Sequence, residues 1–477
     1  MEIERTNTLA LHEQIERSLR ESIRCGRLPA GMRMPSTRGL ASELGISRGV
    51  VTEAYQRLTE DGHVAGRSRA GTTVVAAPAA AAAEAMGARP ALATGPAAPG
   101  LFSGRPGAGI FDAMRAAPAR IDLSPGLPDL AAFPRAAWLR AERAILADLS
   151  PGDLAYGDPT GVPALRRAVA SWLARTRGIR ADPAEIIIVA GVSQAIGLLS
   201  QVLRSDGITA VAVEEPGSLG VRQHLRNWQM GTPPVPVDAE GLRVDQLRAT
   251  GARAVMVTPA HQFPTGAVLS GPRRHELRQW ARDGGLVIED DYDAEHRYDR
   301  PPVPALRAML AGQVCYAGSV SKLLAPALRL GWLLAPPQYR TALINAKRNA
   351  DLGNAALPQL VLARLIDTGE LERQLRLLRR RHRRRRDAMI ASIRAHLPGA
   401  VVHGAAAGLH LMITFPPGFA DTDLAAAALA RGVKVQPLSW HGQLPRDPGL
   451  VLGYAARTPA DIHDAVTVLG DIAARWS

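Results

Sequence analysis

Apolar residues recur every three or four positions through the first 62 residues of the chain. Between residues 9 and 25 they lie on one face of a predicted helix, at Leu11, Ile15, Leu19 and Ile23. Gly26 ends this helix, and two shorter helical patterns follow that meet at Gly45, a residue suited to a tight turn. Two helices joined by so short a turn predict a helix-turn-helix.

The segment after Gly62, HVAGRSRAGTTVV, has two short β-prone ends around a tip rich in Arg and Gly. This pattern predicts a β-hairpin. A hairpin directly after a helix-turn-helix is a wing. Residues 1–75 are therefore expected to form an α+β winged helix-turn-helix domain.

The remainder of the chain divides into a linker and a large domain. Residues 76–118 are dominated by Ala, Pro and Gly, a composition that predicts a semi-flexible linker. Over residues 119–477, β-rich runs such as EIIIVA, GLVIED and VCYAGSVS alternate with helical segments, which predicts a mainly parallel sheet covered by helices. From about residue 346, long helices followed by short strands predict a smaller α+β C-terminal domain.

Length and composition place the chain in a broad class. Its 477 residues exceed what one hydrophobic core usually supports. No apolar run approaches the roughly 18 residues of a membrane helix. Cys25 and Cys315 are the only cysteines and belong to no CxxC or Cys/His cluster, so neither disulfides nor a metal site is expected. We expect a cytoplasmic protein without a membrane partner.

The basic residues are unevenly distributed. Nine Arg fall in residues 373–386, within a helical pattern, and this predicts a long amphipathic helix with an Arg face in solvent. The net charge of +13 therefore does not by itself indicate DNA binding. Lysine is rare: only Lys322, Lys347 and Lys434 occur.

Hydroxyl and guanidinium groups stand at the starts of the two short N-terminal helices. Ser36 and Arg38 open the first of these helices, and Ser47 and Arg48 open the second. Helix N-terminal amides beside such side chains suit a DNA phosphate. The segment from RLPAG to GTTVV resembles the winged helix-turn-helix of GntR-type regulators. The resemblance implies double-stranded DNA as a partner, with Arg38 and Arg48 in contact with it and Gly71 in a wing that lies in the minor groove.

A simpler reading of these arginines stays open. Arg38 and Arg48 could pair with Glu43 or Glu53 on the surface of the domain. The agreement of caps, turn and wing favours DNA binding.

The segment SVSKLLAPALRLGW combines an amine with groups that bind phosphate. Ser319, Ser321 and Arg329 surround Lys322 in sequence, directly after a predicted strand. The hydroxyls and the guanidinium can hold a phosphate while the amine attacks an aldehyde. Pyridoxal 5'-phosphate carries both groups.

Two further segments fit the same cofactor. GLVIEDDYD places Asp290 where a carboxylate could bind a protonated pyridine nitrogen, and Tyr292 where its hydroxyl could reach the phenolic oxygen of the ring. AGVSQA begins a helix at Val192 and Ser193, and its amides would face the phosphate. The acids could instead form a metal site or a solvated turn.

Together these motifs resemble fold-type I pyridoxal-phosphate enzymes, and their order is similar to that of the MocR subfamily of GntR-type regulators. The resemblance implies an aminotransferase-like domain in which Lys322 is the Schiff-base lysine, without a catalytic role. Asp290 and Tyr292 would contact the ring, and Ser319, Ser321 and Arg329 the phosphate. Tyr156 would reach the phosphate of a neighbouring subunit, which presupposes a homodimer.

Three positions depart from the family pattern. Ser218 follows EEPG where the family usually has an aromatic residue that stacks on the cofactor. Val451, in GLVLGYA, replaces an arginine that clamps a substrate carboxylate in aminotransferases. Val192 also replaces a common hydroxyl residue, which leaves its backbone amide as the only donor there.

Three functions remain open from the sequence. The first is a transcription regulator that senses an amine, an amino acid or the cofactor itself at Lys322. The second is an active aminotransferase with an accessory DNA-binding module, which the loss of a clamp at Val451 disfavours. The third is a DNA-binding regulator whose degenerate large domain only dimerises, which Ser218 keeps open.

Overall fold

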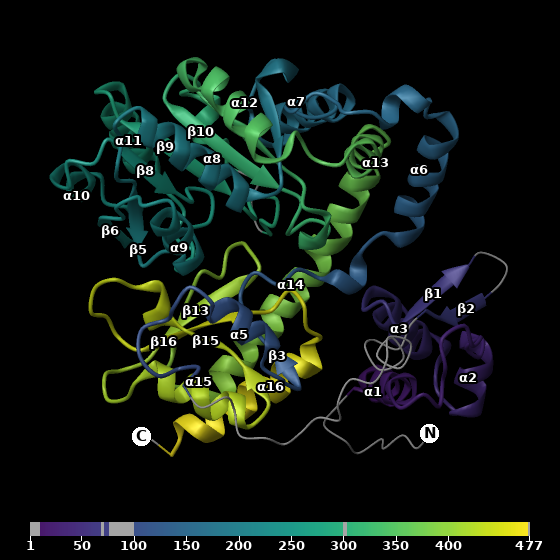
Figure 1. Ribbon diagram of the computed structural model, residues 1–477. Helices are drawn as coiled ribbons and strands as arrows, with labels where there is room; N and C mark the ends of the chain where they lie inside the picture. The colour runs from purple at the N-terminus through teal and green to yellow at the C-terminus, as the bar shows by residue number, and fades with distance from the viewer. Residues whose placement is uncertain (1–9, 68–70, 76–99, 299–302, 476–477) are drawn as a thin grey trace. The chain divides into compact units, whose positions relative to one another are not determined.

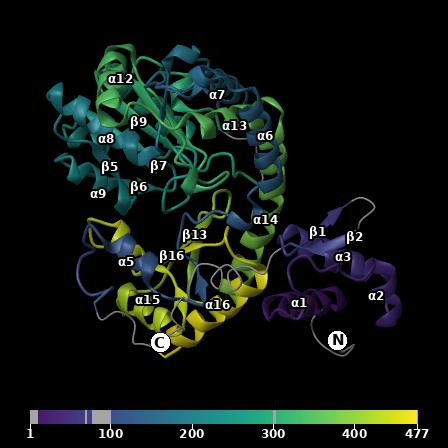
Figure 2. The ribbon, with the colours of Figure 1, turned by 45° about the vertical axis from the view of Figure 1, so that its right-hand side comes forward.

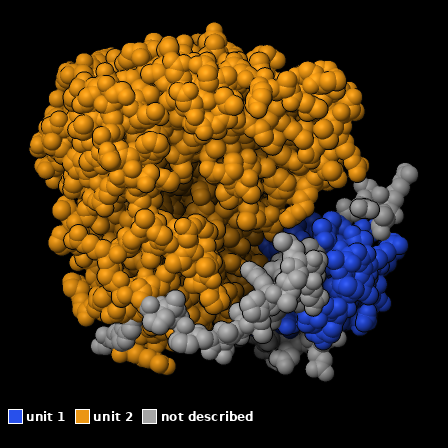
Figure 3. Space-filling view, viewed as in Figure 1, with its two compact units in different colours: residues 1–95 blue, residues 96–477 orange. Residues whose placement is uncertain are grey.

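A computed structural model describes residues 10–67, 71–75, 100–298 and 303–475. The chain divides into two compact units, residues 1–95 and residues 96–477, which Figure 3 colours separately. Each unit is described by itself.

The first unit packs three helices beside a β-hairpin. Its elements are α1 (Leu11–Arg24), α2 (Thr37–Glu43), α3 (Arg48–Glu60), β1 (Val64–Arg67) and β2 (Gly71–Val74). The apolar stripe of α1 is buried against α3 and the hairpin, with Ile15, Ile23, Val51 and Leu58 inaccessible to solvent. Ser36 and Ser47 cap α2 and α3 by accepting hydrogen bonds from Gly39 N and Val50 N. The helix-turn-helix and its hairpin thus form as the periodicity predicts.

The second unit is built on an eight-stranded sheet. The strands are β4 (Ile186–Val189), β5 (Ala212–Glu215), β6 (Pro234–Asp238), β7 (Gly241–Leu242), β8 (Ala254–Val257), β9 (Leu286–Asp291), β10 (Val314–Ser319) and β11 (Gly331–Leu334). Their order is β4-β11-β10-β9-β8-β5-β6-β7. The neighbours from β10 through β6 pair in parallel, whereas β11 and β7 run antiparallel to their neighbours. The predicted mainly parallel sheet is confirmed.

Helices cover both faces of this sheet (Figure 1). They are α7 (Pro163–Arg177), α8 (Val192–Ser205), α9 (Leu219–Asn227), α10 (Val244–Ala249), α11 (Gly271–Arg282), α12 (Pro337–Asp351) and α13 (Ala356–Asp367), and α6 (Arg135–Asp148) packs on α13. On one face α8 and α12 pack on Ile187, Ile288 and Cys315. On the other, α7, α13 and α11 bury the alternate side chains, including Ile188 and Val287. Strands buried on both faces explain the continuous apolar runs in the sequence.

A smaller α+β layer completes the second unit. Its four-stranded sheet has the order β12-β13-β16-β15, with β12 (Val401–His403), β13 (His410–Thr414), β15 (Gln436–Pro437) and β16 (Gly449–Gly453). A separate parallel pair joins β14 (Val433–Lys434) to β3 (Ile121–Asp122). The helices here are α14 (Glu370–His396), α15 (Asp421–Ala430) and α16 (Pro459–Ala473). Figure 2 shows α14 running from beside the large sheet to the small one.

Part of the segment predicted as a linker is folded. Residues 76–99 lie outside the described residues, but residues 100–118 contain a helix, α5 (Ile110–Ala116). Phe102 and Met114 are buried in the core of the smaller layer, and Phe102 stacks on Trp440 with ring centroids 5.3 Å apart. The few large apolar residues in this Ala- and Pro-rich stretch are enough to anchor it.

The arginines of α14 correct a second expectation. Arg381, Arg385 and Arg386 are buried, whereas the sequence pattern placed the Arg face in solvent. Arg385 Nη1 donates to Asp129 Oδ2 at 2.9 Å, and Arg381 Nη1 lies 3.2 Å from the same oxygen. The Arg run therefore includes internal cations that hold the loop around Asp129. Neither α14 nor any other helix in the described ranges is long and apolar enough to cross a membrane.

Candidate functional site

Polar side chains gather at the carboxyl ends of the parallel strands. Glu214 lies near the end of β5, Asp290 near the end of β9, and Ser319 at the end of β10, three residues before Lys322. His261 follows β8 by four residues. Because β5, β8, β9 and β10 are parallel, their ends share one edge of the sheet, where ligands of such sheets bind.

Lys322 is half-buried at this edge. Its Nζ donates a hydrogen bond to the carbonyl of Gly126, in the loop that follows β3. Burial lowers the pKa of Lys322, although the nearby Asp293 and Asp290 oppose the shift. A lowered pKa increases the fraction of neutral amine, which is the nucleophilic form.

Asp290 presents a buried carboxyl group to the same region. Burial raises its pKa to about 7, and the charges of Asp291, Asp293 and Glu214 add to the effect, whereas Lys322 opposes it. Within the described ranges, Asp290 Oδ1 is buried without a hydrogen-bond partner. A buried acceptor without a partner is costly unless a ligand supplies a donor. Asp290 is therefore suited to bind a protonated ring nitrogen.

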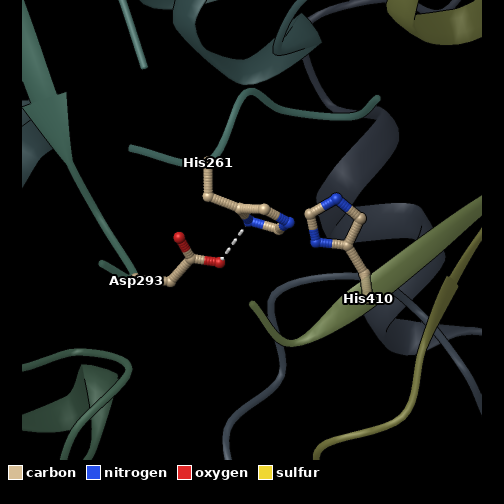
Figure 4. Close-up of side chains that lie close together, drawn as sticks. All are labelled: His261, Asp293 and His410. Atoms are coloured by element: carbon tan, nitrogen blue, oxygen red, sulfur yellow. Dashed lines mark hydrogen bonds and ion pairs between the residues drawn. The ribbon is translucent and has the colours of Figure 1, made fainter. Parts of the chain in front are cut away.

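His261 forms a hydrogen bond with Asp293, with His410 close by (Figure 4). His261 Nδ1 lies 2.9 Å from Asp293 Oδ2 and 3.0 Å from the Tyr292 hydroxyl. The ring of His410 lies 5.2 Å from that of His261, between centroids. His261, Asp293 and His410 offer ligand atoms within 4.8 Å of one another, so they could hold a metal ion. The hydrogen bond from His261 to Asp293 accounts for that pair without one.

A turn and a guanidinium form a possible phosphate cradle beside Lys322. Gly191 has φ +83°, and a Cβ there would lie 3.2 Å from Arg329 Nη1. Val192 and Ser193 then begin the 14-residue helix α8, with backbone N–H groups free of α-helical partners at its start. Arg329 Nη2 donates to the carbonyl of Ala190, which brings the guanidinium to this turn.

The two serines of SVSK lie where β10 ends. Ser319 is buried and its Oγ accepts a 3.4 Å hydrogen bond from Ser321 N, and Ser321 is half-buried. Lys322, Ser319, Ser321, Asp290 and Tyr292 thus all lie at the carboxyl ends of β9 and β10.

Two of the departures from the family pattern, Ser218 and Val451, have local structural roles. Ser218 caps α9, because its Oγ accepts a hydrogen bond from Val221 N at 3.3 Å. Val451 is fully buried in an apolar cluster with Met412 and Leu438, against which Phe263 packs. Val451 therefore places an apolar side chain at the position where the family pattern has an arginine.

Nearby guanidinium groups are already engaged. Arg222 donates to the carbonyls of Gly217, Trp440 and His441, and Arg446 pairs with Glu215. Neither is available to replace a clamp at Val451.

Tyr156 lies apart from these residues. Its side chain is 92% exposed, in a stretch that also exposes several large apolar side chains: Leu130, Leu139, Leu146 and Leu154. Within its own chain it therefore contributes to no buried site.

In the first unit, the starts of α2 and α3 lie close together. Arg48 Nε donates to Thr37 Oγ1 at 3.3 Å, and both Arg38 and Arg48 are exposed. Glu53 pairs with Arg57, whose Nε lies 2.9 Å from its Oε1. The N-terminal ends of both helices are open to a ligand.

The hairpin of the first unit begins its second strand at Gly71. This residue has φ +82°, and a Cβ there would come within 2.9 Å of Arg33 Nε. Arg33 also forms a β-bridge with Thr73, which adds a third strand segment to the wing. Residues 68–70, at the tip, lie outside the described residues.

Sequence reasoning missed several residues at the strand edge. His261, Asp293 and Glu214 each follow or end a strand, so the rule about strand ends could have identified them. Gly126 had no such signal, because a backbone carbonyl leaves no trace in the sequence.

Comparisons with known proteins match both units. Residues 119–469 match the model of the aminotransferase class I and II family, and residues 11–74 match that of the bacterial regulatory proteins of the gntR family. The chain is 32% identical to a probable rhizopine catabolism regulatory protein, MocR, of Rhizobium meliloti, over 98% of this chain and 94% of that protein. It is 31% identical to the pyridoxine biosynthesis transcriptional regulator PdxR of Corynebacterium glutamicum, over 95% and 96%.

A solved structure resembles the second unit. The Pyrococcus horikoshii kynurenine aminotransferase superposes with a TM-score of 0.70 and 26% identity, over 77% of this chain and 93% of that one.

Proposed function

The chain belongs to the MocR subfamily of GntR-type transcription regulators, and we propose that it binds pyridoxal 5'-phosphate at Lys322 and changes its affinity for operator DNA when that site is occupied. The observation that carries the proposal is the half-buried Lys322 at the same strand edge as the buried Asp290, an amine and an acid whose pKa values are both displaced by desolvation.

The residues at the strand edge fit this cofactor. The Oδ1 atom of Asp290, which has no hydrogen-bond partner within the described ranges, suits a protonated pyridine nitrogen. The turn at Gly191, the start of α8 and Arg329 suit a phosphate. When bound, the cofactor supplies an aldehyde that reacts with primary amines and a ring that withdraws electrons.

Each side chain then has a definite task. Lys322, whose Nζ now donates to the carbonyl of Gly126, would hold the cofactor covalently. Asp290 would keep the ring nitrogen protonated, and Tyr292 would donate to the phenolic oxygen. His261, held by Asp293, fixes the orientation of the Tyr292 hydroxyl. Ser319, Ser321, Arg329 and the amides of Val192 and Ser193 bind the phosphate.

The effector we propose is an amine without an α-carboxylate, or the cofactor itself. The apolar cluster of Val451, Met412, Leu438 and Phe263 offers no bidentate partner for a carboxylate. This also favours a regulator over an aminotransferase, because turnover requires a substrate held in fixed geometry.

We propose a homodimer as the working form. The exposed apolar side chains between residues 130 and 156 are suited to burial against a second copy. In such a dimer Tyr156, which is exposed in its own chain, would reach the phosphate bound by the neighbouring subunit.

DNA binding is assigned to the first unit. The exposed Arg38 and Arg48, with the capped starts of α2 and α3, support contacts to the DNA backbone and to base edges. The positive φ of Gly71 supports a wing that can approach the minor groove closely.

The visible absorbance of the purified protein tests the cofactor assignment. Wild type incubated with pyridoxal 5'-phosphate and freed of excess should absorb in the visible range, and Lys322→Ala should lose the band of the covalently attached cofactor. A colourless wild type would favour the alternative in which the second unit binds no cofactor and only dimerises. Rapid release of keto acid from amino acids would instead identify an aminotransferase.

A further inference from the structure

A closed ring of hydrogen bonds links the two sides of the phosphate cradle through Lys347. Gln194 Oε1 accepts from Ala190 N at 2.7 Å and from Lys347 Nζ at 2.9 Å. Lys347 Nζ also donates to Asn354 Oδ1 at 2.6 Å, and Asn354 Nδ2 donates to the carbonyl of Arg329 at 3.1 Å. Arg329 closes the ring with its hydrogen bond to the carbonyl of Ala190.

The ammonium group of Lys347 has a complete set of partners. Besides Gln194 and Asn354, it donates to Asp351 Oδ2 at 2.7 Å, and Asp351 accepts from Gln194 Nε2 at the same distance. Three N–H donors thus meet three acceptors. The Lys347 side chain is fully buried, so it is not itself a contact for a ligand in the cradle.

The members of this ring come from distant parts of the chain. Gln194 lies in the first turn of α8, Lys347 near the end of α12, and Asn354 in the loop before α13. Only the fold brings them to the turn at Gly191 and to Arg329. The two cradle elements are otherwise a helix start and an exposed arginine with a left-handed backbone, at φ 50°.

We propose that Lys347 is a positioning residue for the phosphate of the ligand, one that fixes the distance between the α8 amides and the Arg329 guanidinium. This inference rests on the proposed function, which places the phosphate of pyridoxal 5'-phosphate in that cradle. Fixed donors bind an anion better than mobile ones because less ordering accompanies binding.

Two aldehydes that differ only in the phosphate test the proposal. Full-length wild type and Lys347→Met are titrated with pyridoxal 5'-phosphate and with pyridoxal, and the visible absorbance at Lys322 is recorded. The variant should need about tenfold more of the phosphorylated aldehyde, with the response to pyridoxal nearly unchanged. Lys434→Met is the matched control, because Lys434 is also buried and paired, with Asp122 at 3.5 Å, away from the cradle.

A second variant separates geometry from charge. Asn354→Ala removes the link between Lys347 and Arg329 without changing a charge, and it too should weaken binding of the phosphorylated aldehyde selectively. Equal weakening for both aldehydes, or none, in both variants would overturn the positioning role. A wild type that gives no absorbance with either aldehyde would overturn the proposed function, and this inference with it.

Discussion

At the scale of single residues, burial makes the ionisation of several carboxyl groups in the second unit unfavourable. Burial raises the pKa of Asp290 to about 7, and burial likewise raises the pKa of Glu214 and of Glu289 to about 7. The unfolded chain ionises such groups near pH 4. Between these pH values the folded chain holds more protons than the unfolded one, so these groups lower the stability of the cofactor-free protein as pH rises towards 7.

Asp290→Asn should therefore change the pH dependence of stability. Asparagine stays neutral, so the variant avoids the cost of a buried anion. The difference in the free energy of unfolding between the variant and wild type should therefore grow in favour of the variant by on the order of 2 kcal/mol from about pH 5 to about pH 8. Thermal melts of both cofactor-free proteins at the two pH values measure this gain, and a difference that does not change with pH would contradict it.

Functional residues could be predicted from the sequence where they lie at or just after the end of a predicted strand. Lys322, Asp290 and Ser319 were identified because parallel strands bring their carboxyl ends to one edge, and the structure does collect them there. Gln194, Lys347 and Asn354 could not be connected in this way. The hydrogen bond between Lys347 and Gln194 joins α12 to α8 across 153 residues, and the sequence carries no signal for such long-range pairing.

At the scale of elements, α3 is the helix expected to read DNA. It begins at Arg48, is capped by Ser47, and is held on α1 by a core that includes Ile15, Val51 and Leu58. Arg57 ties it to Glu13 through a 3.3 Å hydrogen bond. The exposed N-terminal end of α3 is thus rigidly supported, which suits entry into the major groove.

Arg48→Ala should weaken binding of the full-length protein to DNA from its own promoter region. Loss of one specific contact costs about 1–3 kcal/mol, or roughly fivefold to 150-fold in affinity. Arg17→Ala is the matched control, because Arg17 is an exposed arginine on α1, away from the start of α3. Equal effects of the two substitutions in a DNA titration would refute a specific role for Arg48.

Elements with strong periodicity were predicted well, and those without it were not. The pattern of Leu11, Ile15, Leu19 and Ile23 gave α1 to within two residues at each end. Helix α5 was missed because Ala, Pro and Gly dominate its surroundings, although Phe102 and Met114 anchor the segment. The buried arginines of α14 were also missed, because their partner Asp129 lies some 250 residues earlier in the chain.

At the scale of the whole molecule, the chain joins a DNA-binding unit to an aminotransferase-like unit. Both units and the mainly parallel sheet followed from the sequence, since apolar periodicity and composition change sharply between them. Regulation requires a coupling free energy between effector binding and DNA binding. An effector alters DNA binding only if it favours one DNA-binding state over another. The proposed regulator requires such coupling.

The affinity of the full-length protein for DNA from its own promoter region, measured with and without pyridoxal 5'-phosphate and then with an apolar primary amine, tests the central claim most directly. The account predicts a change of about tenfold for wild type on occupation of the site, and a Lys322→Ala protein that still binds DNA without this response. A wild-type affinity that is the same in every condition, or an equal response from Lys322→Ala, would contradict it.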